Sequence, residues 1–345
     1  MSDQNAVLHV GIDLGTSRSA VSASNGRRHV IESYVGWPRD MVARKVLKKD
    51  LLIGEEAVGN RSMLDLRRPL ERGLVKEGSD KDLQAVREIL QHLLDLAGTG
   101  EPAKKGGKPP KTRAVVGVPA EAMRVNKQQL RKILEGSVDG LLIVSEPFAV
   151  AYGLDALLHS MVVDIGAGTT DFCVMRGHFP TEEDQRTLDA AGDSIDTYLL
   201  KLIGDRYPDA QVSVYMVREW KEKHGFVGEP QSPVMVTAPV AGKPTEFDIT
   251  EQMRTACESI VEPIAEAMLD LLPRIDPDFQ EEVRNNIILS GGTSQLAGLR
   301  PRLEEALDAI GGGKIRAVKD PVFGGSDGGL ALAIDAQDSD WDLLT

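Results

Sequence analysis

The sequence predicts an α/β protein of two domains, and three observations lead to that prediction. Strand-like and helix-like segments alternate along the chain, as they do in α/β architectures. The 345 residues are enough for two domains of ordinary size. One motif, an apolar strand followed by a glycine-rich turn with hydroxyl side chains, occurs once in each half of the chain.

Composition and charge indicate a soluble globular protein. Hydrophobic residues make up 41% of the chain, and no apolar run approaches the roughly 18 residues that a membrane-spanning helix needs. The N-terminal segment lacks the basic and apolar regions of a signal peptide. The formal net charge of -13 argues against broad contact with nucleic acid or an anionic membrane surface. We therefore expect a cytoplasmic protein with no direct nucleic-acid partner and no membrane insertion.

The two cysteines, Cys173 and Cys257, are too few for a disulfide framework, and neither has a partner at metal-binding spacing. Free thiols of this kind are typical of a reduced compartment.

Short-range patterns predict the individual elements. Leu8–Leu14 is an apolar strand, and Asn25 and Gly26 form a hairpin turn between the two strands that follow it. Asp80–Ala97 carries apolar residues at the helical period, and Gly98 ends it. The expected elements are strands Leu8–Leu14, Val21–Ala23 and His29–Ser33, helix Asp80–Ala97, strand Ala114–Val118, helix Glu121–Glu135, strand Leu141–Val144, helix Pro147–Leu158, the strand that begins at Met161, and strand Asn286–Leu289.

Two polar segments are expected to lie in solvent. Glu101–Lys111 is a low-complexity patch, which we interpret as a solvated loop, with a nucleic-acid-binding arm as the alternative. The acidic tail Asp335–Asp342 is expected to be frayed and solvated, with a partner-docking segment as the alternative.

The repeated motif indicates a site for a polyphosphate held between paired domains. Val10–Ser17 and Val163–Thr170 share its plan. Glycines let backbone N–H groups approach phosphate oxygens, and the hydroxyls add donors. Asp13 and Asp164 are anionic and cannot bind phosphate directly, so a hydrated Mg²⁺ between them is the economical explanation. One such turn alone is common at strand ends, whereas two matched copies favour a functional interpretation.

Asp171 follows the second turn. It either caps that turn or faces the nucleotide without contacting it, and the sequence leaves both interpretations open.

From end to end, the chain resembles the actin-fold ATPases, and five sequence blocks of that superfamily appear in order. A sixth segment, Val217–Val227, resembles the actin segment that surrounds the adenosine, although a solvated charged helix face is the alternative. Eukaryotic actin has a lysine where this chain has Ala20, so Mg²⁺ and backbone amides are expected to meet the phosphate charge. The five blocks are the first phosphate loop Gly11–Ser17, the first connecting helix Val144–Leu154, the second phosphate loop Val162–Phe172, the adenosine block Ile287–Leu299 and the second connecting helix Phe323–Ala333.

The resemblance implies ATP or ADP with Mg²⁺ as the ligands, and it assigns roles by position. Asp13 and Asp164 would hold the metal through water, and Asp164 would also serve catalysis with Glu146. Glu146 is expected to orient the attacking water; its structural alternative is a first-turn acid that favours the helix dipole. The nucleotide-binding residues implied are Gly15, Thr16, Ser17, Gly166, Gly168, Thr169, Thr170, Arg218, Lys221, Glu222, Gly291, Gly292 and Thr293.

Small residues in the two connecting helices predict that these helices cross closely, because glycine inside a helix costs around 1 kcal/mol relative to alanine and needs a reason. Such a crossing could act as a hinge between the two halves. The residues are Ala149, Ala151, Gly153, Gly325, Gly328, Gly329 and Ala331.

The actin-like fold also implies a discontinuous layout of two RNase-H-like domains with a nucleotide cleft between them and a small insertion on each. Residues 1–32, 67–151 and 322–345 would form subdomain IA, and 33–66 subdomain IB. Residues 152–186 and 250–321 would form subdomain IIA, and 187–249 subdomain IIB.

Within the superfamily, the chain is most similar to the bacterial actins that form filaments along magnetosome chains. That resemblance implies a cytoskeletal, self-assembling ATPase that polymerises with ATP and Mg²⁺ and disassembles after hydrolysis, with adaptor proteins on magnetosomes as possible partners. A rod-shape or plasmid-partitioning actin is the alternative, and a monomeric phosphotransferase of the same fold is a more distant one. A chaperone-type ATPase would need a peptide-binding domain after the second connecting helix, which we do not expect here.

Overall fold

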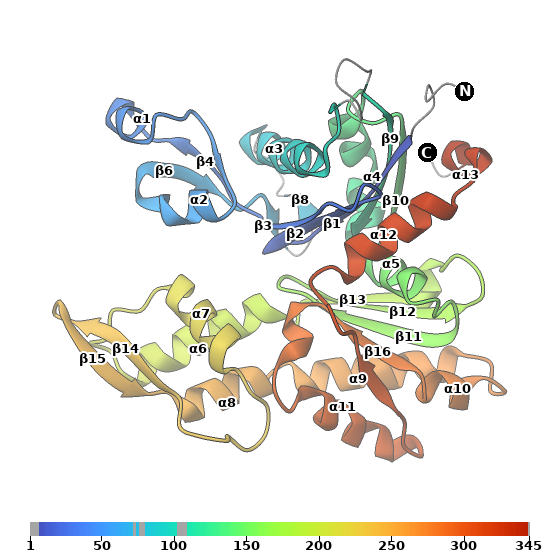
Figure 1. Cartoon of the computed structure of the whole chain (residues 1–345). Helices are drawn as coiled ribbons and strands as arrows, with labels where there is room; N and C mark the ends of the chain where they lie inside the picture. Colours follow the sequence, from blue (N-terminus) through green and yellow to red (C-terminus); the bar gives the residue numbers. More distant parts are fainter. Residues whose placement is uncertain (1–6, 72–73, 76–79, 102–108, 344–345) are drawn as a thin grey trace. The chain divides into compact units, whose positions relative to one another are not determined.

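The computed structural model describes residues 7–71, 74–75, 80–101 and 109–343 (Figure 1). The chain divides into two compact units. Unit 1 comprises Met1–Leu157 and Asp320–Thr345, and unit 2 comprises Leu158–Lys319. The chain therefore passes from one unit to the other twice, at 157/158 and at 319/320. The division into four subdomains remains a prediction.

The sheet of unit 1 has the strand order β10-β9-β1-β2-β3. The central strand β1 pairs in parallel with β9 and antiparallel with β2. Its strands are β1 (Val7–Leu14), β2 (Arg18–Ala23), β3 (Arg28–Glu32), β9 (Lys111–Val118) and β10 (Gly140–Ser145), and its helices are α3 (Asp80–Ala97), α4 (Ala120–Leu134), α5 (Glu146–Gly153), α12 (Gly324–Asp335) and α13 (Asp338–Leu343).

A small second layer of unit 1 follows β3 in the chain. Its sheet has the order β5-β4-β6, and helix α1 begins where the Asp40 side chain accepts hydrogen bonds from the N–H groups of Val42 and Ala43. The elements of this layer are β4 (Val35–Pro38), α1 (Met41–Leu47), β5 (Leu52–Ile53), α2 (Glu55–Gly59), η1 (Arg61–Met63) and β6 (Leu64–Arg67). The next two strands, β7 (Leu70–Glu71) and β8 (Leu74–Val75), form a separate two-stranded sheet.

The sheet of unit 2 repeats the plan of the first, with the order β13-β12-β11-β16-β17. Its strand β11 pairs antiparallel with β12 and in parallel with β16, as β1 does with β2 and β9. The doubled motif of the sequence therefore lies on equivalent strands, β1 and β11. The strands are β11 (Leu158–Ile165), β12 (Thr170–Arg176), β13 (Gln185–Leu188), β16 (Ile287–Ser290) and β17 (Ile315–Ala317).

Helices of unit 2 cover this sheet, and a separate hairpin extends from it (Figure 1). The elements are η2 (Glu182–Asp184), α6 (Gly192–Arg206), α7 (Val214–His224), hairpin β14 (Met235–Val240) and β15 (Lys243–Asp248), α8 (Thr250–Glu258), α9 (Val261–Leu271), η3 (Leu272–Arg274), α10 (Gln280–Arg284), η4 (Gly292–Gln295), α11 (Leu299–Leu307) and η5 (Asp308–Ile310).

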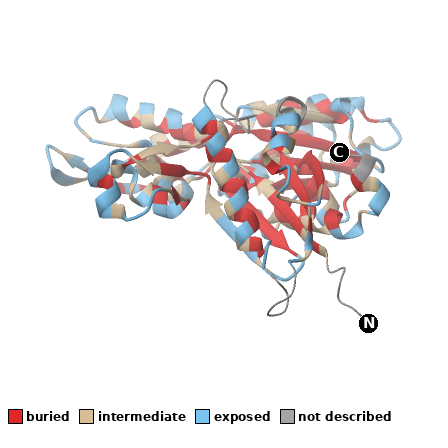
Figure 2. Cartoon of the chain, turned by 90° about the horizontal axis from the view of Figure 1, so that it is seen from above, coloured by how far each residue is buried: buried red, intermediate tan, exposed pale blue. Residues whose placement is uncertain are grey.

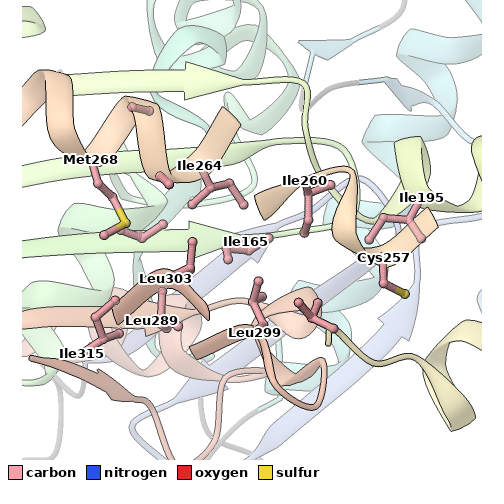
Figure 3. Packing of buried hydrophobic residues seen from close by; sticks show 14 of the residues in the cluster. Ile165, Ile195, Cys257, Ile260, Ile264, Met268, Leu289, Leu299, Leu303 and Ile315 are labelled. Atoms are coloured by element: carbon pink, nitrogen blue, oxygen red, sulfur yellow. The ribbon is translucent and has the colours of Figure 1, made fainter. Parts of the chain in front are cut away.

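Each unit has its own hydrophobic core, and the central strands are the most buried parts (Figure 2). In unit 1, Val10 and Ile12 of β1 are fully buried. In unit 2, side chains from α9 and α11 gather with side chains of the sheet (Figure 3). Both cysteines are free and lie in unit 2, and burial raises the pKa of Cys257 to about 11.

The predicted helix Pro147–Leu158 is too long. Helix α5 ends at Gly153, and Asp155 adopts a positive φ of 52°. Strand β11 then begins at Leu158, which pairs with Arg176 of β12. Leu158, which the apolar pattern had assigned to the end of the helix, is therefore the first residue of a strand.

The prediction that the acidic tail is frayed is wrong for the part that the structure describes. Helix α12 continues to Asp335, and α13 follows at Asp338–Leu343. Trp341 is 4% exposed, and the Arg113 guanidinium lies 5.3 Å from its ring centroid and 2.5 Å from Asp338. A single buried aromatic residue anchors a segment whose charge predicted solvation. The core of the low-complexity patch, residues 102–108, lies outside the described residues.

Across the described ranges, no helix combines the length and apolarity required to cross a bilayer.

Candidate nucleotide-binding site

The first phosphate loop is the turn between β1 and β2 in unit 1. The carbonyl oxygen of Gly15 accepts hydrogen bonds from the hydroxyls of Ser19 (3.4 Å) and Ser33 (2.7 Å). The carbonyl oxygen of Thr16 accepts one from Nε of Arg68 (2.9 Å). A Cβ atom on Gly15 would lie 2.4 Å from the carbonyl oxygen of Arg18, so the turn requires glycine there. Side chains of the same unit hold this loop in place through its carbonyl groups.

Asp13 and Glu146 meet beside this loop. Asp13 is near the end of β1, Glu146 is the first residue of α5, and their side chains share a hydrogen bond. Burial raises the pKa of Asp13 to about 6, and the hydrogen bond with Glu146 acts in the opposite direction. The structure therefore brings together a predicted metal-holding carboxylate and the predicted water-orienting carboxylate.

Helix α12 completes the surroundings of Asp13. A Cβ atom on Gly325 would lie 2.6 Å from Oδ2 of Asp13, and one on Gly11 would lie 2.0 Å from the carbonyl oxygen of Ser326. The glycines of this helix thus allow it to lie directly against β1. Close packing of the predicted kind also occurs between α12 and α5, where a Cβ atom on Gly328 would lie 1.8 Å from the carbonyl oxygen of Ala149.

The second phosphate loop is the turn between β11 and β12 in unit 2. Its Gly166 N–H donates to the carbonyl oxygen of Thr169 (2.9 Å), which closes the turn. The carbonyl oxygen of Gly166 accepts from the Thr293 hydroxyl (2.7 Å) and from the N–H of Gly192 (3.2 Å). The N–H of Asp193 donates to the carbonyl oxygen of Ala167 (2.7 Å). The first N–H groups of α6 therefore hold this loop by its carbonyls.

Thr170, just after the loop, donates its hydroxyl to the carbonyl oxygen of Ala190 (2.6 Å). Gly168 and Thr169 are both buried within the turn.

Asp164 lies at the end of β11, with Ser290 of β16 beside it and Asp171 of β12 opposite. Gly291 has a φ of 80°, and a Cβ atom there would lie 2.5 Å from Oδ1 of Asp164. The adenosine block and the second phosphate loop, which are far apart in the sequence, are thus neighbours in unit 2. Gly292, which follows Gly291, is exposed and begins the short helix η4.

The Asp171 carboxylate is 1% exposed and accepts a hydrogen bond from the Thr187 hydroxyl of β13 (2.6 Å). This bond runs across the sheet rather than along the turn, and it links β12 to the edge strand.

The three predicted adenosine residues lie on α7 in unequal surroundings. Lys221 is buried, with Nζ 2.8 Å from the carbonyl oxygen of Gly192 and 2.7 Å from Oδ1 of Asp196. Nε of Arg218 donates to Oδ2 of Asp196 (3.1 Å), and another of its nitrogens donates to Asp193 (3.2 Å). Glu222 is exposed.

Sequence reasoning missed Asp196, although a signal was present. Ile195, Leu199 and Ile203 are buried at helical spacing on α6, and Asp196 belongs to the same buried face. An acid among the apolar positions of a helix indicates a buried ion pair, because a buried carboxylate needs a partner.

The residues present fit a hydrated Mg²⁺ that accompanies a polyphosphate. Asp13 in unit 1 and Asp164 in unit 2 carry carboxylates that can accept hydrogen bonds from metal-bound water. Gly325 and Gly291 pack closely against them, where a Cβ atom would lie 2.6 Å and 2.5 Å from a carboxylate oxygen. Within the described ranges, no three His, Cys, Asp or Glu side chains gather to hold a metal by themselves. A Mg²⁺ ion would take its other ligands from phosphate oxygens and water, as this ion commonly does.

Comparisons with known proteins show which family the chain belongs to. The family model described as MreB/Mbl protein matches residues 7–328. The chain is 40% identical over 337 residues to the actin-like protein MamK of Paramagnetospirillum magneticum, covering 98% of this chain and 95% of that protein. It is also 40% identical to MamK of Magnetospirillum gryphiswaldense, with coverage of 97% and 91%. A MamK-like protein of P. magneticum is 34% identical over 100% of this chain and 99% of its own length.

Solved structures are similar as well. A MamK double helical filament matches with a TM-score of 0.91 at 40% identity, covering 96% of this chain and 100% of that chain. A non-polymerising MamK mutant bound to AMPPNP matches with a TM-score of 0.73 over the same shares. The actin-like fold predicted from the sequence is thereby confirmed. The chain belongs to the MreB/Mbl family of actin-like proteins, in the group that includes MamK.

Proposed function

We propose that the protein is a cytoplasmic, filament-forming ATPase that assembles with bound ATP and Mg²⁺ and disassembles after hydrolysis. The observation that carries the proposal is the full-length 40% identity to proteins solved as filaments, combined with phosphate loops in both units. Its main partner would be further copies of itself. Its cellular role would be a cytoskeletal scaffold that aligns and positions magnetosomes, with adaptor proteins on those vesicles as further partners.

Residues of both units contribute to binding in this proposal. Backbone amides of Gly15–Ser17 and Ala167–Thr170 bind phosphate oxygens, and the hydroxyls of Thr16, Ser17 and Thr169 add donors. Gly291–Thr293 and the α7 residues contact the adenosine and ribose. Asp13 and Asp164 accept hydrogen bonds from water bound to Mg²⁺. When bound, that ion neutralises charge on the phosphates.

Glu146 is proposed to orient the attacking water and to accept its proton. Two observations support this role: its side chain lies beside Asp13, and it is the first residue of α5, directly after β10. A carboxylate at this position can orient a water molecule for attack on the terminal phosphate, and positioning is a large part of what a protein contributes to hydrolysis of a phosphoanhydride.

Helix α1 supports self-assembly through its surface. Met41, Val42 and Val46 are 81%, 65% and 61% exposed, although they are apolar. Arg44, Lys45 and Lys48 lie on the same short helix or at its end. Arg44 pairs with Asp50 (3.2 Å), and the two lysines add positive charge in a chain whose net charge is -13. Burial of the apolar side chains against a second copy of the chain would stabilise the contact, and the excess of acidic residues in that copy would favour it.

Sedimentation with and without nucleotide tests the proposal. The purified protein should pellet in the presence of ATP and Mg²⁺ and should release phosphate as it assembles. A protein that stays in the supernatant over a range of salt and protein concentrations would contradict the filament-forming function and would leave the monomeric phosphotransferase as the alternative to test.

The match to the MreB/Mbl family model supports one alternative cellular role, that of a rod-shape or plasmid-partitioning actin. Imaging a tagged copy in its native cell distinguishes the two: filaments along magnetosome chains support the first role, and filaments elsewhere support the second.

A further inference from the structure

Asp196 occupies an unusual place in unit 2. It lies in the second turn of α6 and is 1% exposed, yet it carries a carboxylate. Two cations of α7 meet it, with Nε of Arg218 3.1 Å from Oδ2 and Nζ of Lys221 2.7 Å from Oδ1. The side chains of Arg218 and Lys221 are themselves only 14% and 9% exposed. Such a buried network is held by its own partners rather than by water.

The network continues to the second phosphate loop. Nζ of Lys221 donates to the carbonyl oxygen of Gly192, the first residue of α6. The N–H of Gly192 in turn donates to the carbonyl oxygen of Gly166. Gly192 is tightly surrounded, since a Cβ atom there would lie 2.8 Å from the Thr293 hydroxyl and 3.1 Å from Nζ of Lys221. A shift of Lys221 therefore acts directly on the residue that holds the loop.

We propose that Asp196 is a positioning residue that fixes Lys221 and Arg218 and, through Gly192, preforms the second phosphate loop for nucleotide. The proposal rests on the proposed nucleotide-binding function. It predicts that Asp196 matters for the phosphates as well as for the adenosine, although its own side chain faces α7 rather than the loop. A loop that is already shaped for its ligand loses less freedom on binding, which raises affinity.

The test uses two ligands, Mg-ATP and Mg-tripolyphosphate, because the second has no adenosine. Asp196→Asn keeps the shape of the side chain and removes its charge. We expect it to weaken binding of both ligands at least tenfold, as measured by isothermal titration calorimetry. Glu222→Gln provides the contrast: it changes a predicted adenosine residue and should weaken Mg-ATP without changing tripolyphosphate affinity.

Asp184→Asn is the matched control for lost stability. Asp184 is also a buried acid of unit 2, 3% exposed, with Nε of Arg176 2.8 Å away. It lies toward the opposite end of the β12–β13 pair from Thr170. This variant should lower the melting temperature without changing either affinity by more than twofold. An equal loss of affinity in both variants would show that Asp196 serves stability alone and would overturn the proposal.

Normal tripolyphosphate affinity in Asp196→Asn would also overturn it. If that variant does not fold, Asp196→Glu serves instead, since it keeps the charge but displaces the carboxylate. Weaker binding of both Mg-ATP and Mg-tripolyphosphate by this variant supports the proposal, and unchanged affinity for both contradicts it. A wild-type protein that binds neither ligand would refute the proposed function itself, and this inference with it.

Discussion

At the scale of single residues, the contact between Asp13 and Glu146 is the most informative one for chemistry. Burial raises the pKa of Asp13 to about 6, and the hydrogen bond with Glu146 acts in the opposite direction. Binding of a divalent cation favours the ionised form of a carboxylate. In the proposed function, the pair would therefore link metal binding to protonation and to the orientation of water.

Glu146→Ala tests the catalytic half of this pair. We expect ATP hydrolysis to slow at least a hundredfold, since a group of this kind typically contributes about 10²–10⁴ in rate. Nucleotide binding and assembly should survive, so filaments should persist where the wild type turns over. Phosphate release and pelleting measure the two effects, and Glu146→Gln, which keeps the hydrogen-bonding shape, is the companion variant. Near-normal phosphate release in the variant would show that Glu146 acts only as a first-turn acid that favours the helix dipole.

The raised pKa of Asp13 predicts how metal binding depends on pH. The folded-state value of about 6 lies above the usual 3.8, so the protonated carboxyl favours the folded state, and this stabilisation fades as pH rises from about 4 to about 6. Mg²⁺ needs the ionised form, so Mg-ATP affinity should fall as pH is lowered from 7 to 5.

Asp13→Asn separates this effect from titration of the nucleotide itself. The amide cannot ionise, so this variant should bind Mg-ATP more weakly at pH 7 and show a flatter pH profile. Calorimetry at pH 5, 6 and 7 gives both profiles, and identical slopes for wild type and variant would count against Asp13 as the linked group.

At the scale of elements, helices α5 and α12 of unit 1 cross at very short distance, and glycine at the crossing makes this packing possible. Gly328 approaches the backbone of Ala149, and Gly153 approaches Gly328, so neither helix tolerates a side chain at the crossing. Both helices belong to unit 1, and the chain leaves that unit a few residues after α5 and re-enters it a few residues before α12. The glycines therefore serve close packing within the unit.

Replacing one helix glycine at the crossing and one away from it should have opposite effects. Gly328→Ala places a methyl group against backbone atoms that cannot move aside, and it should destabilise the protein by about 1–3 kcal/mol. Gly204→Ala on α6 meets open space, is exposed, and should stabilise it by about 0.5–1 kcal/mol. Urea unfolding measures both, and a stabilising Gly328→Ala would contradict the close crossing.

At the scale of the whole molecule, assembly is expected to depend on exposed surfaces that contribute little to the stability of the folded monomer. Val46→Glu on α1 adds a negative charge where the side chain is 61% exposed, so the monomer should keep its stability. Pelleting with Mg-ATP should fall severalfold or more, because the substitution opposes both the apolar contact and its basic charge. Phe179→Glu, at a 53% exposed apolar residue of unit 2, is the control and should pellet normally. Equal pelleting of Val46→Glu and wild type would remove α1 from the interface.

The sequence by itself determined the features that depend on neighbouring residues. The helical period predicted Asp80–Ala97 with the bounds that the structure has. The doubled motif predicted equivalent places for Asp13 and Asp164, and both lie near the ends of the equivalent strands β1 and β11. These features could be predicted because hydrophobic period, turn chemistry and glycine at close approaches act over a few residues.

Only the tertiary structure decided the rest. Asp196 meets Lys221, Asp13 meets Glu146, and Trp341 packs at Gly140, in each case across a long stretch of chain. Local patterns had assigned Leu158 to a helix and the acidic tail to solvent. Such patterns carry no information about a distant strand that pairs with Leu158 or about the distant residues that bury the indole of Trp341. Burial of a charge or an aromatic ring depends on what the folded chain brings to it, and that partner is set by packing rather than by sequence neighbours.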